Sequence, residues 1–419
     1  MNTHTDRPLS PRYKWYVVWM LWCISLFNYA DRQAIFSVFP LLEKEFHLTP
    51  MQLGLLGSSF AWVYGLCAPF AGNIVDRVRR TSAILWGLYA WSLICMATAV
   101  SRKFSHLFFF RAAEGLGETF YYPASMSLVS DYHGVRTRSR AMGLHQTSVY
   151  FGTIAGGFFA GLIGQRYGWR WSFVVFGGLG ILLGLALKKY LIEPQRGAAD
   201  PGARVAGRMP LIAFLKVIWG TPTVLTLMGA FLCANFVAVV LLSWMPKFLY
   251  DKFHYSLATA GLMATLFVQL ASMAGAPLGG WLADLARKRA VGGRMAVQAL
   301  GVLCGAPFVF LCGQADSAVW LITALIAWGL CKGFYDASIF ASVYEVIRPE
   351  ARGTAAGFMN MVGWLGGGSS PVVIGYLTGR MGLGMAISLA SLVYLAAGAL
   401  LITGILAFVK RDAARALAG

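Results

Sequence analysis

Three ionisable residues share one apolar stretch of the chain, from Phe108 to Ser130. Arg111 and Glu118 are seven residues apart, about two turns of an α-helix, and Glu114 lies between them, so all three project from one face. An ionisable side chain in the middle of a lipid bilayer costs about 2.5–3.5 kcal/mol. We therefore expect this face to look into a protein interior or a watery cavity. There the three residues could exchange protons or bind a charged ligand, or merely neutralise one another and hold helices together.

The composition is that of a membrane protein with several spans. Of the 419 residues, 58% are hydrophobic and 12% are charged, whereas soluble proteins carry about 25% charged residues. The first apolar segment, 15–38, is too long for a signal peptide and lacks a small-residue cleavage site, so we expect it to be retained. The net charge of +18 resides in short loops between apolar segments, which is a topology signal and not a nucleic-acid surface. The seven cysteines indicate no disulfide framework.

Twelve apolar segments, each about 20 residues or longer, are long enough to cross the hydrocarbon layer of a bilayer. The predicted spans are 15–38, 51–74, 80–101, 105–130, 140–165, 171–190, 221–246, 257–284, 294–314, 317–344, 352–378 and 382–409. An even number of spans puts both termini on one side. The termini and the even-numbered loops, together with the span ends beside them, hold 24 of the 35 Lys and Arg residues, against 8 in the odd-numbered loops, so both termini are expected in the cytoplasm.

The longest break between spans divides the chain into two halves. Residues 193–220 are rich in Pro, Gly, Ala and Arg, a composition typical of a linker. We predict an N-terminal six-helix domain at 1–192, a cytoplasmic linker at 193–220 and a C-terminal six-helix domain at 221–419. The glycines of the fifth span have counterparts in the eleventh span, which indicates an internal repeat.

A motif recurs at the end of the second span of each half. Gly72 stands four residues before Asp76, Gly280 stands four residues before Asp284, and basic residues follow both copies. Glycine permits close helix approach, and each aspartate could pair with a basic residue of a neighbouring loop. Besides anchoring the topology, such pairs could hold the two halves together in one state and break in another. The predicted gating residues are Asp76, Arg77, Arg80, Asp284 and Arg287.

Two six-helix halves, a long central loop and this duplicated motif resemble the major facilitator superfamily over essentially the whole chain. The resemblance implies an all-α membrane protein with twelve transmembrane helices in two pseudo-symmetric six-helix bundles around a central cavity. Transport in that family works by rocking of the halves. Parallel repeats with a site near the middle of the membrane are the expected architecture.

Two shorter stretches resemble narrower branches of that family. Residues 28–32, NYADR, and 111–123, RAAEGLGETFYYP, are similar to the anion:cation symporter branch, whose bacterial members carry sugar acids and other organic anions with protons. The same stretches also resemble the Spinster-type branch, some of whose members move lysolipids. Polar and glycine-rich residues in 360–377 favour the symporter branch.

The resemblance assigns roles to the charged residues. Asp31 and Glu118 match the positions proposed for proton coupling, and Arg32 and Arg111 match the cationic side of the substrate site. Glu114, which shares the face of Arg111 and Glu118, is added to the proton-coupling set. Asp31 and Arg32 are adjacent and point about 100° apart on a helix, so both cannot project straight into one cavity. We expect Arg32 to hold the anion and Asp31 to titrate, although Asp31 could instead be a structural partner of Arg111.

Uncharged polar residues add to the candidate substrate site. His145, within the predicted span 140–165, could contact substrate or carry a proton, or it could be a hydrogen-bonded packing residue. Lys332 and Asp336 are four residues apart and can satisfy each other as a pair. The second half carries fewer charges, so we expect coupling mainly in the first half and part of the recognition of substrate shape in the second. Besides the two arginines, the predicted substrate-binding residues are Tyr29, Tyr121, His145, Gln146, Asn235, Gln269 and Asn360.

No metal cluster, nucleotide-binding loop or nucleophile motif is recognisable, so we expect no cofactor or metal, and transport energy must come from a gradient. The predicted function is secondary active transport, as proton-coupled symport of a small organic anion such as a sugar acid or carboxylate. The alternatives are proton-coupled export of a lysolipid or other amphipath and, in another class, a membrane-embedded enzyme or receptor. We expect a monomer in the bacterial inner membrane, whose partners are an anionic substrate, protons and membrane lipid, not nucleic acid.

Overall fold

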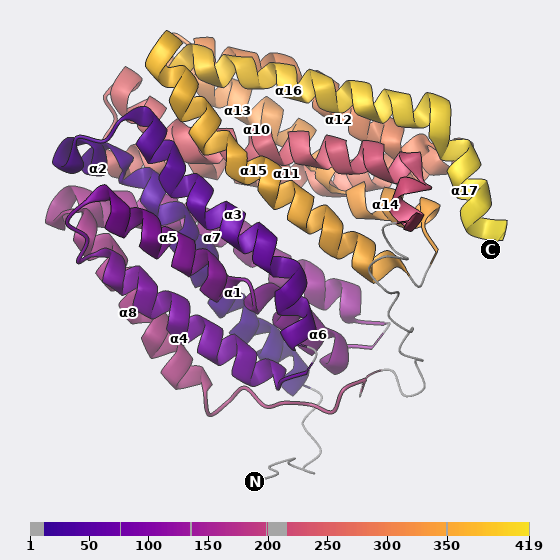
Figure 1. Cartoon of the computed structure of the whole chain (residues 1–419), viewed down its shortest axis with the longest axis horizontal. Coiled ribbons are helices and arrows are strands. Elements are labelled where there is room, and N and C mark those ends of the chain that lie inside the picture. The colour runs from indigo at the N-terminus through magenta and orange to yellow at the C-terminus, as the bar shows by residue number, and fades with distance from the viewer. Residues whose placement is uncertain are drawn as a thin grey trace. The chain divides into compact units, whose positions relative to one another are not determined.

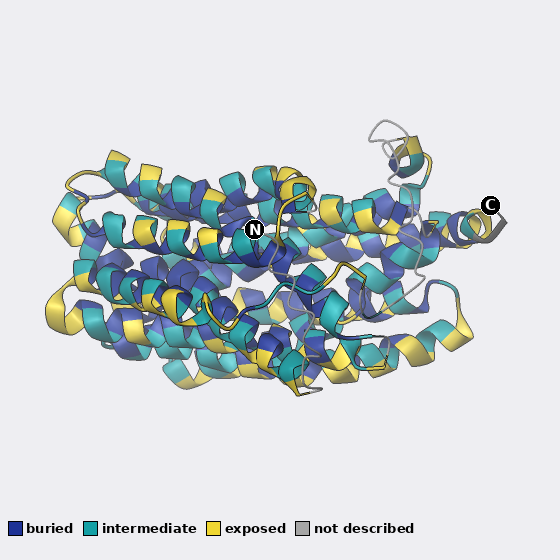
Figure 2. Cartoon of the chain, turned by 90° about the horizontal axis from the view of Figure 1, so that it is seen from below, coloured by how far each residue is buried: buried dark blue, intermediate teal, exposed yellow. Residues whose placement is uncertain are grey.

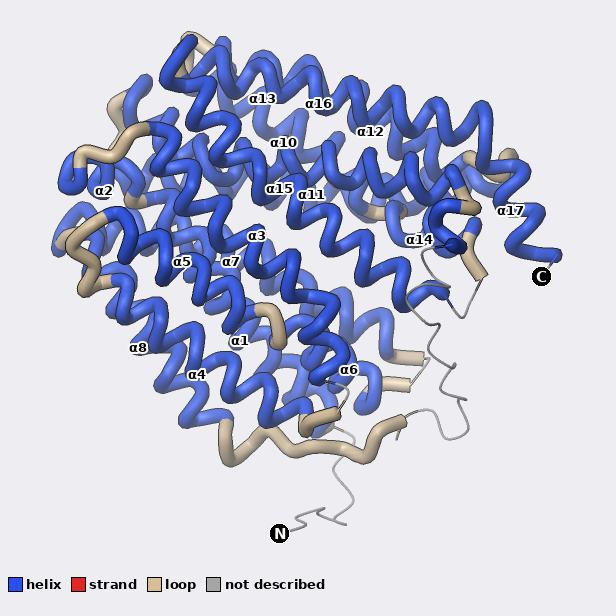
Figure 3. The backbone as a smooth tube through the Cα atoms, viewed as in Figure 1, coloured by secondary structure: helices blue, strands red, loops and turns tan. Residues whose placement is uncertain are grey.

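The computed structural model describes residues 12–75, 77–134, 136–197, 199, 216–348 and 351–418, with side chains described up to residue 416. These residues form helices joined by turns and short connections, and there is no strand among them (Figures 1 and 3). The all-α fold class is therefore confirmed. The predicted gating residue Asp76 and most of the predicted linker lie outside the described residues.

The helices follow one another through both halves of the chain. In the first half they are α1 (Tyr13–Ser37), α2 (Phe39–Phe46), α3 (Pro50–Val75), α4 (Arg80–Thr98), α5 (Phe104–Glu118), α6 (Tyr121–Tyr132), α7 (Arg138–Tyr167) and α8 (Trp169–Leu187). In the second half they are α10 (Pro222–Phe253), α11 (Leu257–Arg289), α12 (Gly293–Gln314), α13 (Ala318–Asp336), α14 (Ile339–Val346), α15 (Arg352–Met381), α16 (Leu383–Thr403), the π-helical turn η2 (Gly404–Phe408) and α17 (Val409–Ala418).

Two compact units are distinguished by their internal contacts. Unit 1 comprises the described residues of 1–47, 66–205 and 256–262, and unit 2 comprises those of 48–65, 206–255 and 263–419. Helices α3 and α11 each contribute residues to both units. The predicted boundaries of two six-helix domains stay a prediction.

Every predicted span has a helical counterpart. Among the described residues, nine stretches are long and apolar enough to cross a membrane. Helices α1, α5 and α15 are not among the nine; α1 carries Asp31 and Arg32, and α5 has only 15 residues. Large apolar side chains lie exposed on the helices, for example Trp86 at 73% and Phe70 at 70%, and Figure 2 shows exposed residues recurring along individual helices. Such surfaces suit contact with lipid.

Two predicted spans are interrupted. In place of one helix over 105–130, α5 ends at Glu118 and α6 begins at Tyr121. Pro123 has no N–H to donate to the carbonyl four residues earlier, which weakens the helix at this point. In the second half, α13 ends at Asp336 and α14 begins at Ile339. The two halves therefore share a two-residue break directly after a carboxylate residue.

At the second break, a buried glutamine side chain donates hydrogen bonds to two serine hydroxyl groups, one just before α14 and one within it. Gln298 of α12 is 0% exposed, and its Nε2 donates to Ser338 Oγ at 3.0 Å and to Ser342 Oγ at 2.8 Å. These bonds attach the chain at the break to α12.

Glycines bring α1 and α7 into close contact within unit 1. A Cβ atom built on Gly156 would lie 2.6 Å from the Cα atom of Ala30, and one built on Gly152 would lie 3.1 Å from that of Leu26. Larger residues there would force the helices apart. Because Ala30 directly precedes Asp31, this contact fixes the position of the charged part of α1.

Helix α15 packs against α10 of unit 2 in a similar way. A Cβ atom built on Gly366 would lie 3.0 Å from the Cα atom of Leu232. In each half, a glycine-rich helix therefore packs on the first helix of that half, in agreement with the predicted correspondence between the fifth and eleventh spans.

Candidate functional site

A buried ion pair joins α1 to α5. Arg32 donates to Glu118 Oε2 from Nη2 at 2.6 Å and from Nε at 3.2 Å. Arg32 Nη2 also donates to Asn28 Oδ1 at 3.3 Å, one turn earlier on α1. The Glu118 side chain is 0% exposed and the Arg32 side chain 10% exposed. A charge-assisted pair therefore links two residues that are 86 positions apart in the sequence.

A second ion pair lies within α5. Arg111 Nη1 donates to Glu114 Oε2 at 2.5 Å, and both side chains are 0% exposed. The spacing of three residues puts both side chains on one face of the helix. Because Glu118 on the same face is also buried, this face looks into the protein interior, which is one of the two surroundings that the sequence predicted for it.

Asp31 lies beside these pairs without a hydrogen bond of its own. The residue is 0% exposed, and neither carboxylate oxygen has a hydrogen-bond partner among the described residues. One of its oxygens, one Glu114 carboxylate oxygen and Cys95 Sγ all lie within 4.8 Å of one another. Asp31 therefore lies close to a second carboxyl group. Two ionised carboxylates this close repel each other unless a proton or a cation is nearby.

The same three residues have ligand types that a metal ion could use. Sequence reasoning expected no metal cluster, because Asp31, Cys95 and Glu114 are far apart in the chain. Two features disfavour a bound cation here: the guanidinium of Arg111 already bonds Glu114, and Cys95 Sγ donates to the Phe173 carbonyl at 3.6 Å.

The cluster as a whole contains three carboxyl groups and two guanidinium groups. All five belong to unit 1, come from α1 and α5, and are buried. We call these five residues the charged cluster: Asp31, Arg32, Arg111, Glu114 and Glu118. With every group ionised the charged cluster has a net charge of −1, so the addition of one proton balances it.

Two predicted aromatic residues have different surroundings. The guanidinium carbon of Arg32 lies 4.6 Å from the centre of the Tyr29 ring, a cation–π contact. The Tyr121 hydroxyl donates to the Leu21 carbonyl at 2.6 Å and accepts from His145 Nε2 at 2.9 Å. The His145 residue is 1% exposed. His145 is thus bonded as a packing residue would be, and Tyr29 is the aromatic residue that the structure brings to the charged cluster.

The remaining predicted binding residues are not held at the charged cluster by any described contact. Gln146, in unit 1, is exposed. Asn235, in unit 2, donates from Nδ2 to the Phe231 carbonyl of its own helix at 2.9 Å. Gln269 is buried and Asn360 is half-buried, both in unit 2. Their roles stay predictions.

Two of the predicted gating residues take part in an ion-pair network inside unit 2. Arg294 Nη2 donates to Asp284 Oδ1 at 2.6 Å, and Arg294 Nη1 donates to Glu345 Oε1 at 2.6 Å. Arg287 Nε donates to the same Glu345 oxygen at 2.8 Å. The network ties α11, α12 and α14 together.

A third predicted gating residue, Arg80, takes part in an ion-pair network inside unit 1. It pairs with Asp131, and its Nε donates to Glu193 Oε1 at 2.9 Å. Glu193 also accepts the Thr81 N–H at 2.8 Å. Burial raises the pKa of Glu193, but the hydrogen bonds from Thr81 and Arg80 outweigh it, so the pKa lies below its ordinary value. Arg77 is exposed. In this structure each described pair of a gating residue lies within one unit.

The tenth predicted span contains the expected local pair. Lys332 Nζ bonds Asp336 Oδ2 across one helical turn of α13, so this prediction is confirmed. The pair satisfies both charges without a substrate.

Sequence reasoning gave no role to two residues of the site. Asn28 bonds Arg32, and its position four residues earlier on the same helix was a signal that could have identified it. Cys95 lies on α4 among apolar residues, and nothing in its spacing relates it to Asp31 or Glu114. Only the packing of α4 against α5 reveals its place.

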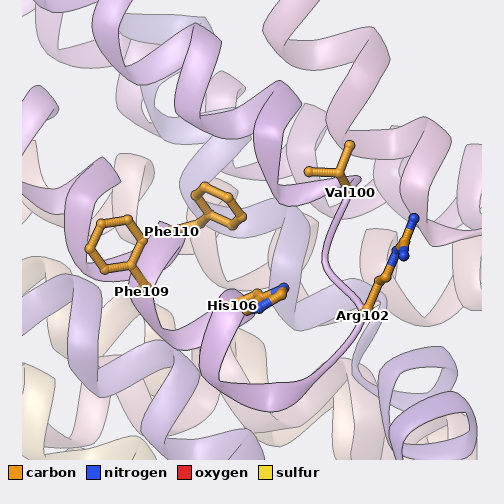
Figure 4. Close-up of a pocket in the computed structure, with 5 residues that line it drawn as sticks. All are labelled: Val100, Arg102, His106, Phe109 and Phe110. Atoms are coloured by element: carbon orange, nitrogen blue, oxygen red, sulfur yellow. The ribbon is translucent and has the colours of Figure 1, made fainter.

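A surface cavity of about 500 Å³ lies elsewhere in unit 1. Figure 4 shows its lining side chains around the turn between α4 and α5. They are Val100, Arg102, His106, Phe109 and Phe110. None of them belongs to the charged cluster, so this cavity is not the predicted substrate site.

Comparison with known proteins identifies relatives over nearly the whole chain. The model of the Major Facilitator Superfamily matches residues 21–371 and 248–417. The chain is 27% identical over 411 residues to the D-galactonate transporter of Escherichia coli O6:H1, covering 91% of this chain and 92% of that protein. It is 24% identical to the probable galactarate/D-glucarate transporter GudP of Escherichia coli K12, covering 88% of each.

A plant relative is longer. The chain is 27% identical to the probable anion transporter 4, chloroplastic, of rice, covering 87% of this chain but only 64% of the rice protein. Among solved structures, a bacterial homologue of the human lysosomal transporter Spinster, inward-facing and unoccupied, superposes with a TM-score of 0.86. It shares 22% sequence identity, and the match covers 96% of this chain and 99% of that one, which establishes the fold.

Proposed function

The chain belongs to the major facilitator superfamily, and on this basis we propose that it carries a small organic anion, with a sugar acid or another carboxylate as the substrate class, together with protons. The observation that carries the proposal is the buried pair of Arg32 and Glu118 beside Asp31. It combines a cation that can bind a carboxylate with carboxyl groups that can take up a proton.

The coupling follows from the cost of an unpaired charge. In the structure Glu118 is bonded to Arg32. A substrate carboxylate that binds Arg32 displaces Glu118, and the displaced carboxylate then lies in the protein interior without a cation. Losing one partner of a buried ion pair costs about 3–5 kcal/mol, and a proton on Glu118 removes most of that cost. Anion binding and proton uptake therefore favour each other, with Asp31 as a further carboxyl group for the proton.

The relatives support the substrate class. Two of them are named as transporters of galactonate and of galactarate or glucarate, and these compounds are sugar acids with one or two carboxylates. A rice relative is named as an anion transporter. A guanidinium in the interior suits such substrates because it bonds a carboxylate with two parallel hydrogen bonds.

We further propose the orientation and the moving parts. The distribution of Lys and Arg supports cytoplasmic termini in a bacterial inner membrane. Two six-helix halves joined by the linker at 193–220 would rock as a monomer, and the pairs of Arg80 and of Asp284 would rearrange during this motion. The uncharged part of the substrate would be bound by polar residues of the second half, namely Asn235, Gln269 and Asn360.

The proposal is tested by uptake of labelled D-galactonate into proteoliposomes under an imposed pH gradient. We expect accumulation that a protonophore abolishes and that is lost in Glu118→Gln, while exchange of labelled for unlabelled substrate continues. Asp316→Asn, whose side chain is 98% exposed, is the matched control and should transport as the unmodified protein does.

Two results would contradict the proposal. One is the absence of gradient-driven uptake across a panel of sugar acids and carboxylates. The other is binding of lysolipid that survives Arg32→Gln while no organic anion binds, which would favour the alternative of lysolipid export.

A further inference from the structure

The two arginines of the charged cluster differ in their access to a ligand. The Arg32 side chain is 10% exposed, and its guanidinium stacks on the half-buried Tyr29. Arg111 and its partner Glu114 are both 0% exposed. A substrate carboxylate can therefore approach Arg32 first, while Arg111 is enclosed together with a carboxylate from its own helix.

We propose that Glu114 makes the site selective for monocarboxylates, so that aldonates are preferred to the dicarboxylate aldarates. Glu114 acts as an internal carboxylate that takes the place on Arg111 where the second carboxylate of an aldarate would bind. This inference rests on the proposed function, and it departs from the sequence-based expectations that Arg111 contacts substrate and that Glu114 takes part in proton coupling.

The geometry explains why Glu114 holds this place. It lies three residues after Arg111 on α5, and the two side chains meet at 2.5 Å without any rearrangement of the backbone. An incoming carboxylate would have to displace a partner that is covalently part of the same helix and fully buried. Arg32 differs, because Glu118 reaches it from another helix.

The other charged groups around Arg111 also disfavour the binding of a second substrate carboxylate there. Asp31 of α1 has an oxygen within 4.8 Å of a Glu114 oxygen, and Cys95 of α4 lies equally near. Glu118 lies one turn further along α5. A second substrate carboxylate at this place would face two protein carboxyl groups in addition to Glu114.

The net charge of the charged cluster with substrate bound explains the preference for a monocarboxylate. With protons on Asp31 and Glu118, the pair of Arg111 and Glu114 is neutral, and Arg32 balances one substrate carboxylate. A dicarboxylate in the same site leaves one negative charge without compensation. Because buried charges in a membrane protein are costly, the dicarboxylate must bring a further proton or bind more weakly.

The first test needs no variant. Dissociation constants of D-galactonate and galactarate are measured by calorimetry with the purified full chain. We expect at least a tenfold preference for galactonate. A preference for galactonate below tenfold, or tighter binding of galactarate, would overturn this inference and leave the proposed function standing. If neither compound and no other sugar acid or carboxylate of a panel binds, both are overturned.

The second test assigns the preference to Glu114. Glu114→Gln keeps the shape and removes the charge, so Arg111 becomes available to a second carboxylate. We expect the galactonate-to-galactarate preference to fall at least tenfold, through tighter binding of galactarate. Glu114→Asp keeps a carboxylate and should keep the preference, and adding Arg111→Gln to Glu114→Gln should remove the gain. An unchanged preference in Glu114→Gln would contradict the inference.

Discussion

Removing Arg111 should destabilise the protein more than removing its partner Glu114. Arg111→Gln leaves three buried carboxyl groups beside the single guanidinium of Arg32, whereas Glu114→Gln leaves two of each charge. Breaking a buried ion pair from one side costs about 3–5 kcal/mol, and the complete burial of both side chains places Arg111→Gln in that range. The loss for Glu114→Gln should be smaller, because Asp31 can then compensate the charge of Arg111.

A double-mutant cycle measures this pair directly. Free energies of unfolding are determined by titrating the purified protein in mixed micelles with a denaturing detergent. The double variant Arg111→Gln/Glu114→Gln should be more stable than the sum of the single losses predicts, by about 2–3 kcal/mol. Arg102→Gln changes an exposed arginine and, as the control, should shift stability by less than about 0.5 kcal/mol. Losses that simply add would refute the reasoning.

Three further predictions concern stability. Gly156→Ala should cost about 1–3 kcal/mol because its methyl group would meet the backbone of α1, whereas Gly143→Ala on the same helix has no atom within 4 Å of its built Cβ and should lose nothing. Asp412→Ala removes the acceptor of two hydrogen bonds at the start of α10 and should cost about 0.5–2 kcal/mol, with Asp412→Asn closer to the unmodified protein. A hydrogen bond from Arg170 lowers the pKa of Glu45, so this carboxylate stabilises the protein above the ordinary glutamate pKa of about 4.3. That contribution to the free energy of unfolding is lost as the pH falls through the lowered pKa. Glu45→Gln should therefore lose less stability on acidification than the unmodified protein does, and an unchanged loss would contradict the assignment.

Most of the fold could be predicted because hydropathy and charge act locally. Apolar segments of sufficient length identify the helices, and the spacing of Arg111, Glu114 and Glu118 identifies a buried face without any tertiary information. The breaks after Glu118 and Asp336 were not predicted. The first break has a proline three residues into α6, and the second is held by the hydrogen bonds of Gln298 to two serines. Hydropathy contains no information on either effect.

The pairing inside the charged cluster could be predicted only in part. The bond between Arg111 and Glu114 follows from their spacing on one helix. The bond between Arg32 and Glu118 depends on the packing of α1 against the other helices, which glycines such as Gly156 determine. For the same reason, sequence spacing could not indicate that His145 would bond Tyr121 and not a charged residue.

The most direct test of this account is the number of protons taken up when the anion binds. The purified protein is titrated with D-galactonate in weakly buffered solution, and the change in pH is recorded. Exchange of Glu118 for substrate on Arg32 predicts net proton uptake with binding, and its loss in Glu118→Gln although that variant still binds the anion. Binding of galactonate without proton uptake, or uptake that persists in Glu118→Gln, would contradict the central claim that this ion pair couples the two.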